Sequence, residues 1–389
     1  MDARNDNPIS QDMETAPPDF ALLRECLSFS TNPERLRSLR IRLLSDRQTW
    51  EKIYYACEPT RLGPALHERL SAQALIPPSP AKPGDELLLP GQVMERIETV
   101  SMARRADLAR GLLSVVKVLN NAGIVPLLLK GSRALWLDRS HWRQMRDLDL
   151  LVPEPDFAEA QSALAESGFS PDPEVAERPH RHHAPPLFHE DIPAAIELHR
   201  RAGNRYAEQF FPTAEIWSLS NEVQSDGLHV RILGDGDDVW HNLVHHYFGH
   251  SGFARGLVDL KGLFEFAAAC SVLEEKEFGT LRANALRCAC GLATLDLWLA
   301  AATEGLGLEL PASQEIETDA MKAWERMRAR QDGDLQSPVR YPGYRETLQL
   351  ALSKPRVDAV SAHCNRAAAR VRLAAVNKLL PKVTRNGRW

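Results

Sequence analysis

The chain has 389 residues, of which 44% are hydrophobic and 25% charged, and its formal net charge is −5 at pH 7. This length favours two or three domains with the balance of an ordinary globular protein. The weak negative charge argues against nucleic acid as the partner of the whole chain, while leaving room for a local basic patch. No apolar run reaches the roughly 18 residues of a membrane-spanning helix, so we expect no membrane partner.

The N-terminus and the cysteines indicate the compartment. Residues 1–20 are polar and lack the basic and apolar regions of a secretory signal. The six cysteines are scattered and form no CxxC pair, which argues against a zinc finger or a disulfide framework. Reduced thiols are typical of the cytoplasm, where we expect the protein to act.

The first third of the chain is predicted to be helical. Apolar residues recur at helical spacing through residues 19–75, as in Trp50–Leu70. Ile76–Gly91 contains five prolines and is predicted to be a linker. A long amphipathic helix is expected at Gln92–Asn121, with a stop signal at Gly123.

Short strands and helices alternate in the middle of the chain. In order, the patterns predict a strand at Val125–Leu129, a short helix ending at Leu137, a strand at Asp147–Val152, a helix at Asp156–Ser167, a proline- and histidine-rich loop at Ser170–Pro186, a strand at Ala194–His199, a further helix, and a strand at Leu228–Leu233.

From Asp235 onward the spacing is helical as far as Leu380, and a basic tail covers Arg356–Trp389. We therefore expect an α+β fold, in which a small mixed β-sheet core is flanked by N- and C-terminal helical regions. The expected parts are a disordered tail at 1–18, a helical region and linker at 19–91, the core at 92–234 and a C-terminal helical domain at 235–389.

Two aspartates on one predicted strand indicate a cation site. Asp147 and Asp149 are two residues apart and share one face, whereas Leu148 and Leu150 face the core. Two like charges on one strand face are unfavourable unless a positive charge lies between them. Mg²⁺ takes oxygen ligands and leaves positions open for phosphate oxygens.

A phosphate site is predicted next to these acids. Gly131 and Ser132 lie between a strand and a helix, where backbone N–H groups can bind an anion, and Lys130 adds a positive charge. A third carboxylate is offered by the strand that carries Glu197, with His199 on the same face. A phosphate site beside a metal site is what nucleotidyl transfer needs, although the sequence does not place the Glu197 strand beside the Asp147 strand.

These motifs resemble those of the DNA polymerase beta-like nucleotidyltransferase superfamily, and more narrowly a family of uncharacterised bacterial nucleotidyltransferases. The resemblance covers roughly residues 20–300. It lies in Leu129-Lys130-Gly131, in Arg143 four residues before the first aspartate, in Asp147-Leu148-Asp149-Leu150-Leu151-Val152, and in Glu197-Leu198-His199. The chain departs from the superfamily pattern in the long stretch 133–146 and in the glutamate that replaces the commoner third aspartate.

The resemblance implies transfer of a nucleoside monophosphate from a nucleoside triphosphate such as ATP, with Mg²⁺ or Mn²⁺ as the metal. The acceptor stays open, with a small molecule, a saccharide or a peptide as the options. The expected catalytic and metal-binding residues are Asp147, Asp149 and Glu197. The expected nucleotide-binding residues are Lys130, Gly131, Ser132, Arg143 and His199.

Other residues leave alternatives open. Arg143 either clamps a phosphate or pairs with an acid, and His199 is either a base or a structural residue. His180, His182, His183 and His189 are either ligand contacts or solvated loop residues. His241 and His245 have the spacing of zinc ligands without the glutamate of a metalloprotease motif. Asp235 and Asp237 are predicted to start a helix, and Arg255 and Asp259 to form an ion pair.

Two rival functions remain. One is a non-catalytic nucleotide-binding protein, and the other is an antitoxin-like interaction protein, both on the same fold. A hydrolase built on the histidines is a more distant alternative. Product formation separates the first rival from an enzyme, and mass shifts on a co-expressed partner would identify the second.

Overall fold

The computed structural model describes residues 19–45, 47–76, 89–171, 182–249, 257–288 and 290–333. Several predictions therefore lie outside the described residues: the tail at 1–18, linker residues 77–88, His180, Arg255, and the helices and basic tail beyond residue 333. Among the described helices, none combines the length and the apolar character needed to cross a membrane.

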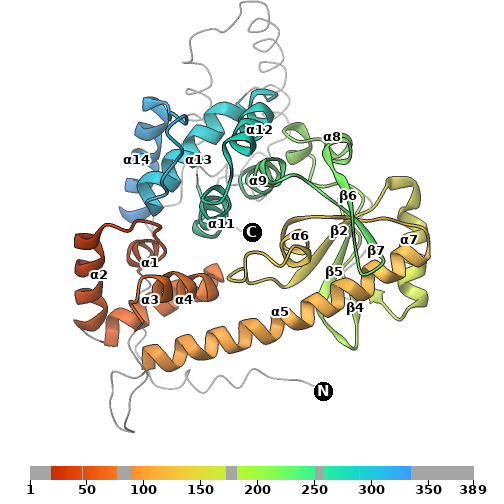
Figure 1. The fold of residues 1–389 in the computed structure, drawn as a ribbon, viewed down its shortest axis with the longest axis horizontal. Coiled ribbons are helices and arrows are strands. Elements are labelled where there is room, and N and C mark those ends of the chain that lie inside the picture. The colour runs from red at the N-terminus through yellow and green to blue at the C-terminus, as the bar shows by residue number, and fades with distance from the viewer. Residues whose placement is uncertain are drawn as a thin grey trace, which may run out of the picture.

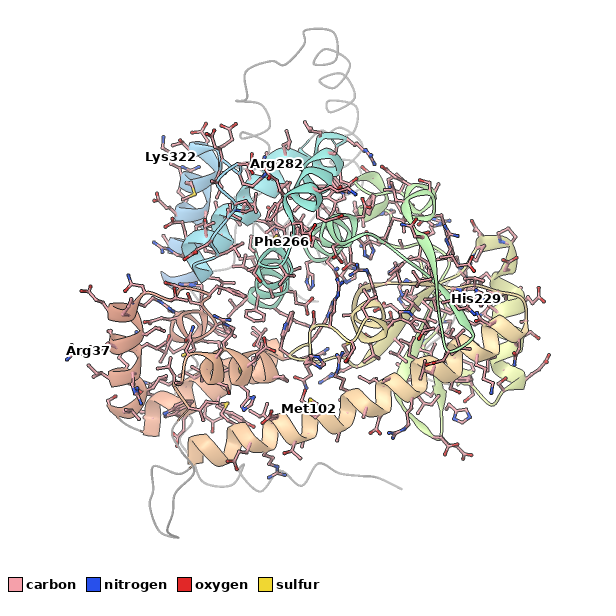
Figure 2. All side chains as sticks on the ribbon, in the orientation of Figure 1. Arg37, Met102, His229, Phe266, Arg282 and Lys322 are labelled. Atoms are coloured by element: carbon pink, nitrogen blue, oxygen red, sulfur yellow. The ribbon has the colours of Figure 1, made fainter. Side chains whose placement is uncertain are left out.

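The N-terminal helices lead into one long helix. They are α1 (Phe20–Cys26), α2 (Pro33–Ser45), α3 (Arg47–Thr60) and α4 (Gly63–Ala72), followed by α5 (Leu89–Asn121). Helix α5 runs from this group to the sheet (Figure 1). Its outer side faces solvent, where Met102 is half exposed (Figure 2). A Cβ at Gly111 would lie 2.7 Å from Ile192, so this glycine lets α5 approach the sheet closely.

The strands of the described residues form one mixed seven-stranded sheet in the order β3-β4-β5-β2-β1-β7-β6. They are β1 (Leu127–Leu128), β2 (Asp147–Leu151), β3 (Ser170–Pro171), β4 (Leu187–His189), β5 (Ile192–His199), β6 (Asn221–Ser225) and β7 (Leu228–Ile232). The connecting helices are α6 (Lys130–Trp136), η2 (Glu154–Asp156), α7 (Phe157–Glu166), η3 (Ala207–Gln209) and α8 (Thr213–Leu219). The mixed sheet that the sequence predicts is confirmed.

One face of the sheet packs against α5 and α7. Leu148, Leu150, Ile196 and Leu198 are fully buried there. The predicted inward side of both strands is thus confirmed, and the alternation of side chains sends the acidic residues to the opposite face. The loop predicted at Ser170–Pro186 is wrong at its start, because Ser170–Pro171 pairs with β4 as a short edge strand.

The C-terminal helices cover that opposite face. They are α9 (Asp235–Val244), the π-helical turn η4 (His245–Gly249), α11 (Leu260–Cys270), α12 (Glu275–Leu286), α13 (Gly291–Leu306) and α14 (Thr318–Gly333). The predicted apolar stripe of the first of these helices is buried, and consists of Trp240, Leu243, Val244, Tyr247 and Phe248.

The helices before and after the sheet share one hydrophobic core. Helix α1 packs against α13, and the hydroxyl of Ser28 donates a hydrogen bond to the carbonyl of Leu306 at 2.8 Å. The backbone N–H of Phe29 donates to the same carbonyl at 2.6 Å. Both helical groups therefore lie on one side of the molecule, with the sheet on the other (Figure 1).

Candidate functional site

The acidic residues meet because β2 and β5 are parallel neighbours. In their register Asp149 lies opposite Glu197, Asp147 opposite Ala195 and Leu151 opposite His199. Residues that share strand parity point to the same face, so the carboxylates of both strands project toward the C-terminal helices. The adjacency that the sequence left open is therefore present in the fold.

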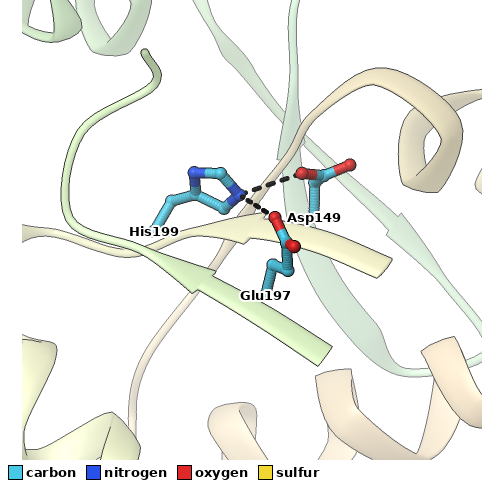
Figure 3. Close-up of side chains that lie close together, drawn as sticks. All are labelled: Asp149, Glu197 and His199. Carbon is cyan, nitrogen blue, oxygen red and sulfur yellow. Dashed lines mark hydrogen bonds and ion pairs between the residues drawn. The ribbon is translucent and has the colours of Figure 1, made fainter. Parts of the chain in front are cut away.

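Asp149, Glu197 and His199 form a close cluster (Figure 3). The Nε2 atom of His199 lies 2.9 Å from Oδ1 of Asp149 and 3.6 Å from Oε2 of Glu197. One ligand atom from each residue lies within 4.8 Å of the others, which makes this the group among the described residues that could hold a metal ion. Asp147 does not belong to that group.

Lys130 completes the cluster. Its Nζ lies 2.8 Å from Oδ1 of Asp149; the Asp149 side chain is buried and that of Lys130 is largely so. Burial by itself raises the pKa of Asp149, but the Lys130 ammonium and the His199 imidazole outweigh it and hold that pKa well below its usual range. Asp149 is therefore a carboxylate at neutral pH.

The other titratable groups of the cluster respond to the same charges. Burial lowers the pKa of His199, but hydrogen bonds to Asp149 and Glu197 raise it overall. Burial raises the pKa of Glu197, whereas its hydrogen bond to His199 lowers it overall. In Asp147 burial raises the pKa and the charges of Asp149 and Glu197 add to it, against smaller opposing effects of Lys130 and Lys261. Asp147 thus has no positively charged side chain as close to it as Lys130 is to Asp149.

The donor set fits a divalent cation. Two carboxylates and one imidazole are suitable ligands for Mg²⁺ or Mn²⁺, with the imidazole favouring the transition metal. Nε2 of His199 faces both carboxylates, and Asp147 carries a charge that the fold leaves poorly compensated. A cation at this position would relieve the repulsion that raises the pKa of Asp147.

Gly131 and Ser132 lie inside the protein. A Cβ at Gly131 would come within 2.3 Å of Sδ of Met145, so the absence of a side chain is needed for packing alone. Ser132 is fully buried, and its hydroxyl has no hydrogen-bond partner. Lys130 begins α6 with a φ of 50°, a left-handed conformation that is rare for a residue with a Cβ.

Arg143 pairs with an acid of the C-terminal helices and not with the carboxylate cluster. Its Nη2 lies 2.9 Å from Oε2 of Glu265 on α11, and Nε2 of His246 lies 3.2 Å from the same oxygen. Nδ1 of His246 lies 3.5 Å from Oδ2 of Asp259, which caps α11. An acidic partner for Arg143 is one of the two alternatives that the sequence leaves open. Glu265 and His246 could not be predicted, because no local pattern links positions so far apart.

The remaining histidines occupy different places. The rings of His182 and His183 lie 5.4 and 5.3 Å from the ring of His199. His189 packs against Phe169. His241 is buried, and burial lowers its pKa to about 3.

Two residues predicted to start a helix also take part in contacts. Asp235 and Asp237 lie in the first turn of α9, as predicted. Asp235 pairs with Arg133 and Arg139, while Asp237 accepts a hydrogen bond from Asn284.

Comparison with known proteins identifies the family. The family described as "uncharacterised nucleotidyltransferase" matches residues 46–301, a stretch that includes the whole carboxylate cluster and more than half of the chain. A search of the curated proteins gives no match. On this evidence the chain belongs to the uncharacterised nucleotidyltransferase family.

Proposed function

We propose that the protein transfers a nucleoside monophosphate from a nucleoside triphosphate to an acceptor hydroxyl, in a reaction that needs Mg²⁺ or Mn²⁺. One observation carries this proposal. The parallel register of β2 and β5 sets Asp149 opposite Glu197 and brings both carboxylates to one buried cluster beside Lys130. Family membership supports nucleotidyl transfer as the reaction class.

The chain's own residues have distinct roles in this proposal. Asp149, Glu197 and Asp147 would hold the cation, with His199 as a further ligand or as a support for the two carboxylates it contacts. Lys130 would keep Asp149 ionised and add positive charge near the triphosphate. Gly131 and Ser132 would orient the turn at the start of α6, next to which the phosphates bind.

The reaction exchanges one phosphorus–oxygen bond for another. The acceptor oxygen bonds to the α-phosphorus, the bond to the β-phosphate oxygen breaks, and pyrophosphate leaves. Glu197 would take the acceptor proton, since its carboxylate is ionised and less buried than that of Asp149. A bound Mg²⁺ or Mn²⁺ supplies charge neutralisation for the phosphates and lowers the pKa of the acceptor hydroxyl.

A second candidate is a protein that binds nucleotide without turnover. It would use the same nucleotide site, beside which Lys130 pairs with Asp149 and Arg143 pairs with Glu265. The two candidates differ in pyrophosphate release, which the binding protein would not show.

Thermal unfolding tests the site directly. The wild type is melted with each of the four common nucleoside triphosphates, with Mg²⁺, with Mn²⁺ and without metal. A ligand at about 100 times its Kd stabilises the folded state by about 2.7 kcal/mol. We expect a metal-dependent rise in Tm that Glu197→Gln abolishes. Glu222→Gln is the matched control, because Glu222 lies on the edge strand β6 and pairs only with His229 among the interactions described for it.

Release of labelled pyrophosphate then separates enzyme from binding protein. A Tm rise with pyrophosphate release in the presence of acceptor extracts supports the enzyme. The proposal fails if no triphosphate changes the Tm with either metal, or if Glu197→Gln responds like the wild type.

A further inference from the structure

A hollow separate from the carboxylate cluster lies beyond the carboxyl-terminal ends of β2 and β5. It has a volume of about 410 Å³, and its lining includes Pro153, Pro155, Arg200, Arg201, Thr213 and Trp217. None of the residues of the carboxylate cluster lines it. The hollow and the cluster are nevertheless neighbours in sequence, because Arg200, which lines the hollow, directly follows His199 at the end of β5.

Two arginines and two glutamates line the hollow, and the arginines are the groups that can bind an anion. The backbone N–H groups of Arg200 and Arg201 both donate to the carbonyl of His182, at 2.9 and 3.2 Å. These hydrogen bonds hold the backbone from which the two side chains extend. The guanidinium of Arg200 lies 4.5 Å from the centre of the Phe157 ring, so it rests on a flat apolar support. Neither arginine forms an ion pair with a carboxylate among the described residues, and Arg201 is exposed.

One atom of this pair lacks a hydrogen-bond acceptor. Nε of Arg200 is buried with no partner. A buried donor that makes no hydrogen bond is unfavourable, so such a group needs an explanation. Nε itself is shielded from the hollow, whereas the two Nη atoms of Arg200 are not among the buried atoms without a partner. Those Nη atoms can bind the two oxygens of a carboxylate or a phosphate.

The acids of the lining do not fill that role. Glu208 is engaged by Thr213, whose backbone N–H and hydroxyl donate to its two carboxylate oxygens at 3.2 and 2.5 Å. Glu154 is exposed at the start of η2. The lining also offers apolar surface, from the indole of Trp217, which is half buried, and from the rings of Pro153 and Pro155.

We propose that this hollow binds an anionic small molecule, with Arg200 and Arg201 holding a phosphate or carboxylate group and Trp217 contacting an attached ring. The volume is at the lower end of the range for small-molecule sites. The site is separate from the proposed transfer reaction, so its occupancy does not depend on the carboxylate cluster.

Calorimetric titration of the full chain tests the proposal, with phenyl phosphate and benzoate as the two probes and benzyl alcohol as the neutral control. We expect at least one anion to bind and the alcohol not to bind. Binding of phenyl phosphate alone assigns a phosphate ester, and binding of benzoate alone assigns a carboxylate. Quenching of tryptophan fluorescence by the bound probe should fall in Trp217→Phe.

Three variants that each remove one arginine charge locate the site. Arg201→Gln should weaken binding about tenfold or more, because a charged hydrogen bond contributes about 1.5–3 kcal/mol. Arg200→Gln should do the same, with its Tm measured to show that it folds. Arg205→Gln is the matched control, since Arg205 is an exposed arginine that contacts Tyr206 and does not line the hollow.

Asp147→Asn should bind the probes as the wild type does, which keeps this result independent of the transfer reaction. The proposal is overturned if neither anion binds the wild type. It is also overturned if Arg201→Gln binds within twofold of the wild type, or if Arg205→Gln loses binding equally.

Discussion

Lys130 and Asp149 form a buried ion pair that joins the start of α6 to the centre of the sheet. The lysine reaches Asp149 from a left-handed backbone position, and His199 contacts the same carboxylate oxygen. The ammonium of Lys130 and the imidazole of His199 thus both stabilise the ionised form of Asp149. A divalent cation that joins the cluster competes with both, so metal affinity and fold stability are linked at this carboxylate.

Replacing Lys130 should reveal this link. Lys130→Met leaves a buried carboxylate with one cationic partner, and breaking a buried pair in this way is unfavourable by about 3–5 kcal/mol. Urea unfolding should show a loss of that order, and Mn²⁺ should restore more stability to the variant than it adds to the wild type. Lys276→Met, an exposed lysine on α12, is the control. A variant as stable as the wild type would contradict the role of the pair.

Replacing Asp147, unlike replacing Lys130, should preserve or raise the stability of the fold while it lowers the transfer rate. Its pKa is raised by burial and by neighbouring carboxylates, so its charge destabilises the metal-free fold at neutral pH. Asp147→Asn should therefore melt at or above the wild-type Tm while losing about 100-fold or more of the transfer rate. The measurement pairs a melting curve without metal with pyrophosphate release. A lower Tm together with full activity would refute this assignment.

His246 should stabilise the fold in a pH-dependent way. Burial lowers its pKa, but Asp259 and Glu265 raise it to about 9. The protonated imidazole therefore contributes stability that is fully present below pH 6.5 and is lost as the pH rises through about 9. The shift corresponds to about 3 kcal/mol. In His246→Gln the free energy of unfolding should change less between pH 6.5 and 9 than in the wild type.

His241, on the preceding helix, provides the matched comparison with the opposite sign. Burial lowers its pKa to about 3, so the folded protein holds it neutral. Its contribution is present above pH 6.5 and is lost as the pH falls below that value. His241→Gln should flatten the acid side of the stability profile and leave the alkaline side unchanged. If the two variants flatten the same side, the assignment of charge to either histidine is wrong.

Gly131 should be required for packing against Met145. Gly131→Ala places a methyl group against Met145, and overpacking of this kind is unfavourable by about 1–3 kcal/mol. In a Met145→Ala background the same change should lower the free energy of unfolding much less, because the sulfur atom that clashes with the methyl group is absent. Chemical denaturation of the four proteins of this cycle gives the coupling. Equal losses in both backgrounds would show that the contact with Met145 does not limit the position.

The strands that carry the acids could be predicted because their patterns are local. Leu148 and Leu150 alternate with the aspartates, and Ile196 alternates with Glu197, so each strand and its inward face follow from a few residues. The register of the two strands could not be predicted in this way, since it depends on packing across the whole sheet. The pairing of Lys130 with Asp149 has the same origin.

The strand at Asn221–Ser225 shows a different limit. Its residues are mostly polar and exposed at the edge of the sheet, so no apolar alternation marks it. It forms by pairing with β7, whose pattern did predict a strand. Likewise, Arg143 could be recognised as a residue in need of an anionic partner, but Glu265 comes from a helix much later in the chain.

The contact of Ser28 with Leu306 has a consequence for synthesis on the ribosome. These two residues are 278 positions apart, and Leu27, next to Ser28, belongs to the same core as Leu306. At about 5–20 residues per second, the first helices wait roughly 15–55 s before their partners are made. During that interval the part of α1 that packs against α13 has no native partner, although α1 can already pack against α3 and α4. A chaperone that holds early helices, or slow translation ahead of α13, would therefore act on this protein's yield more than on its final stability.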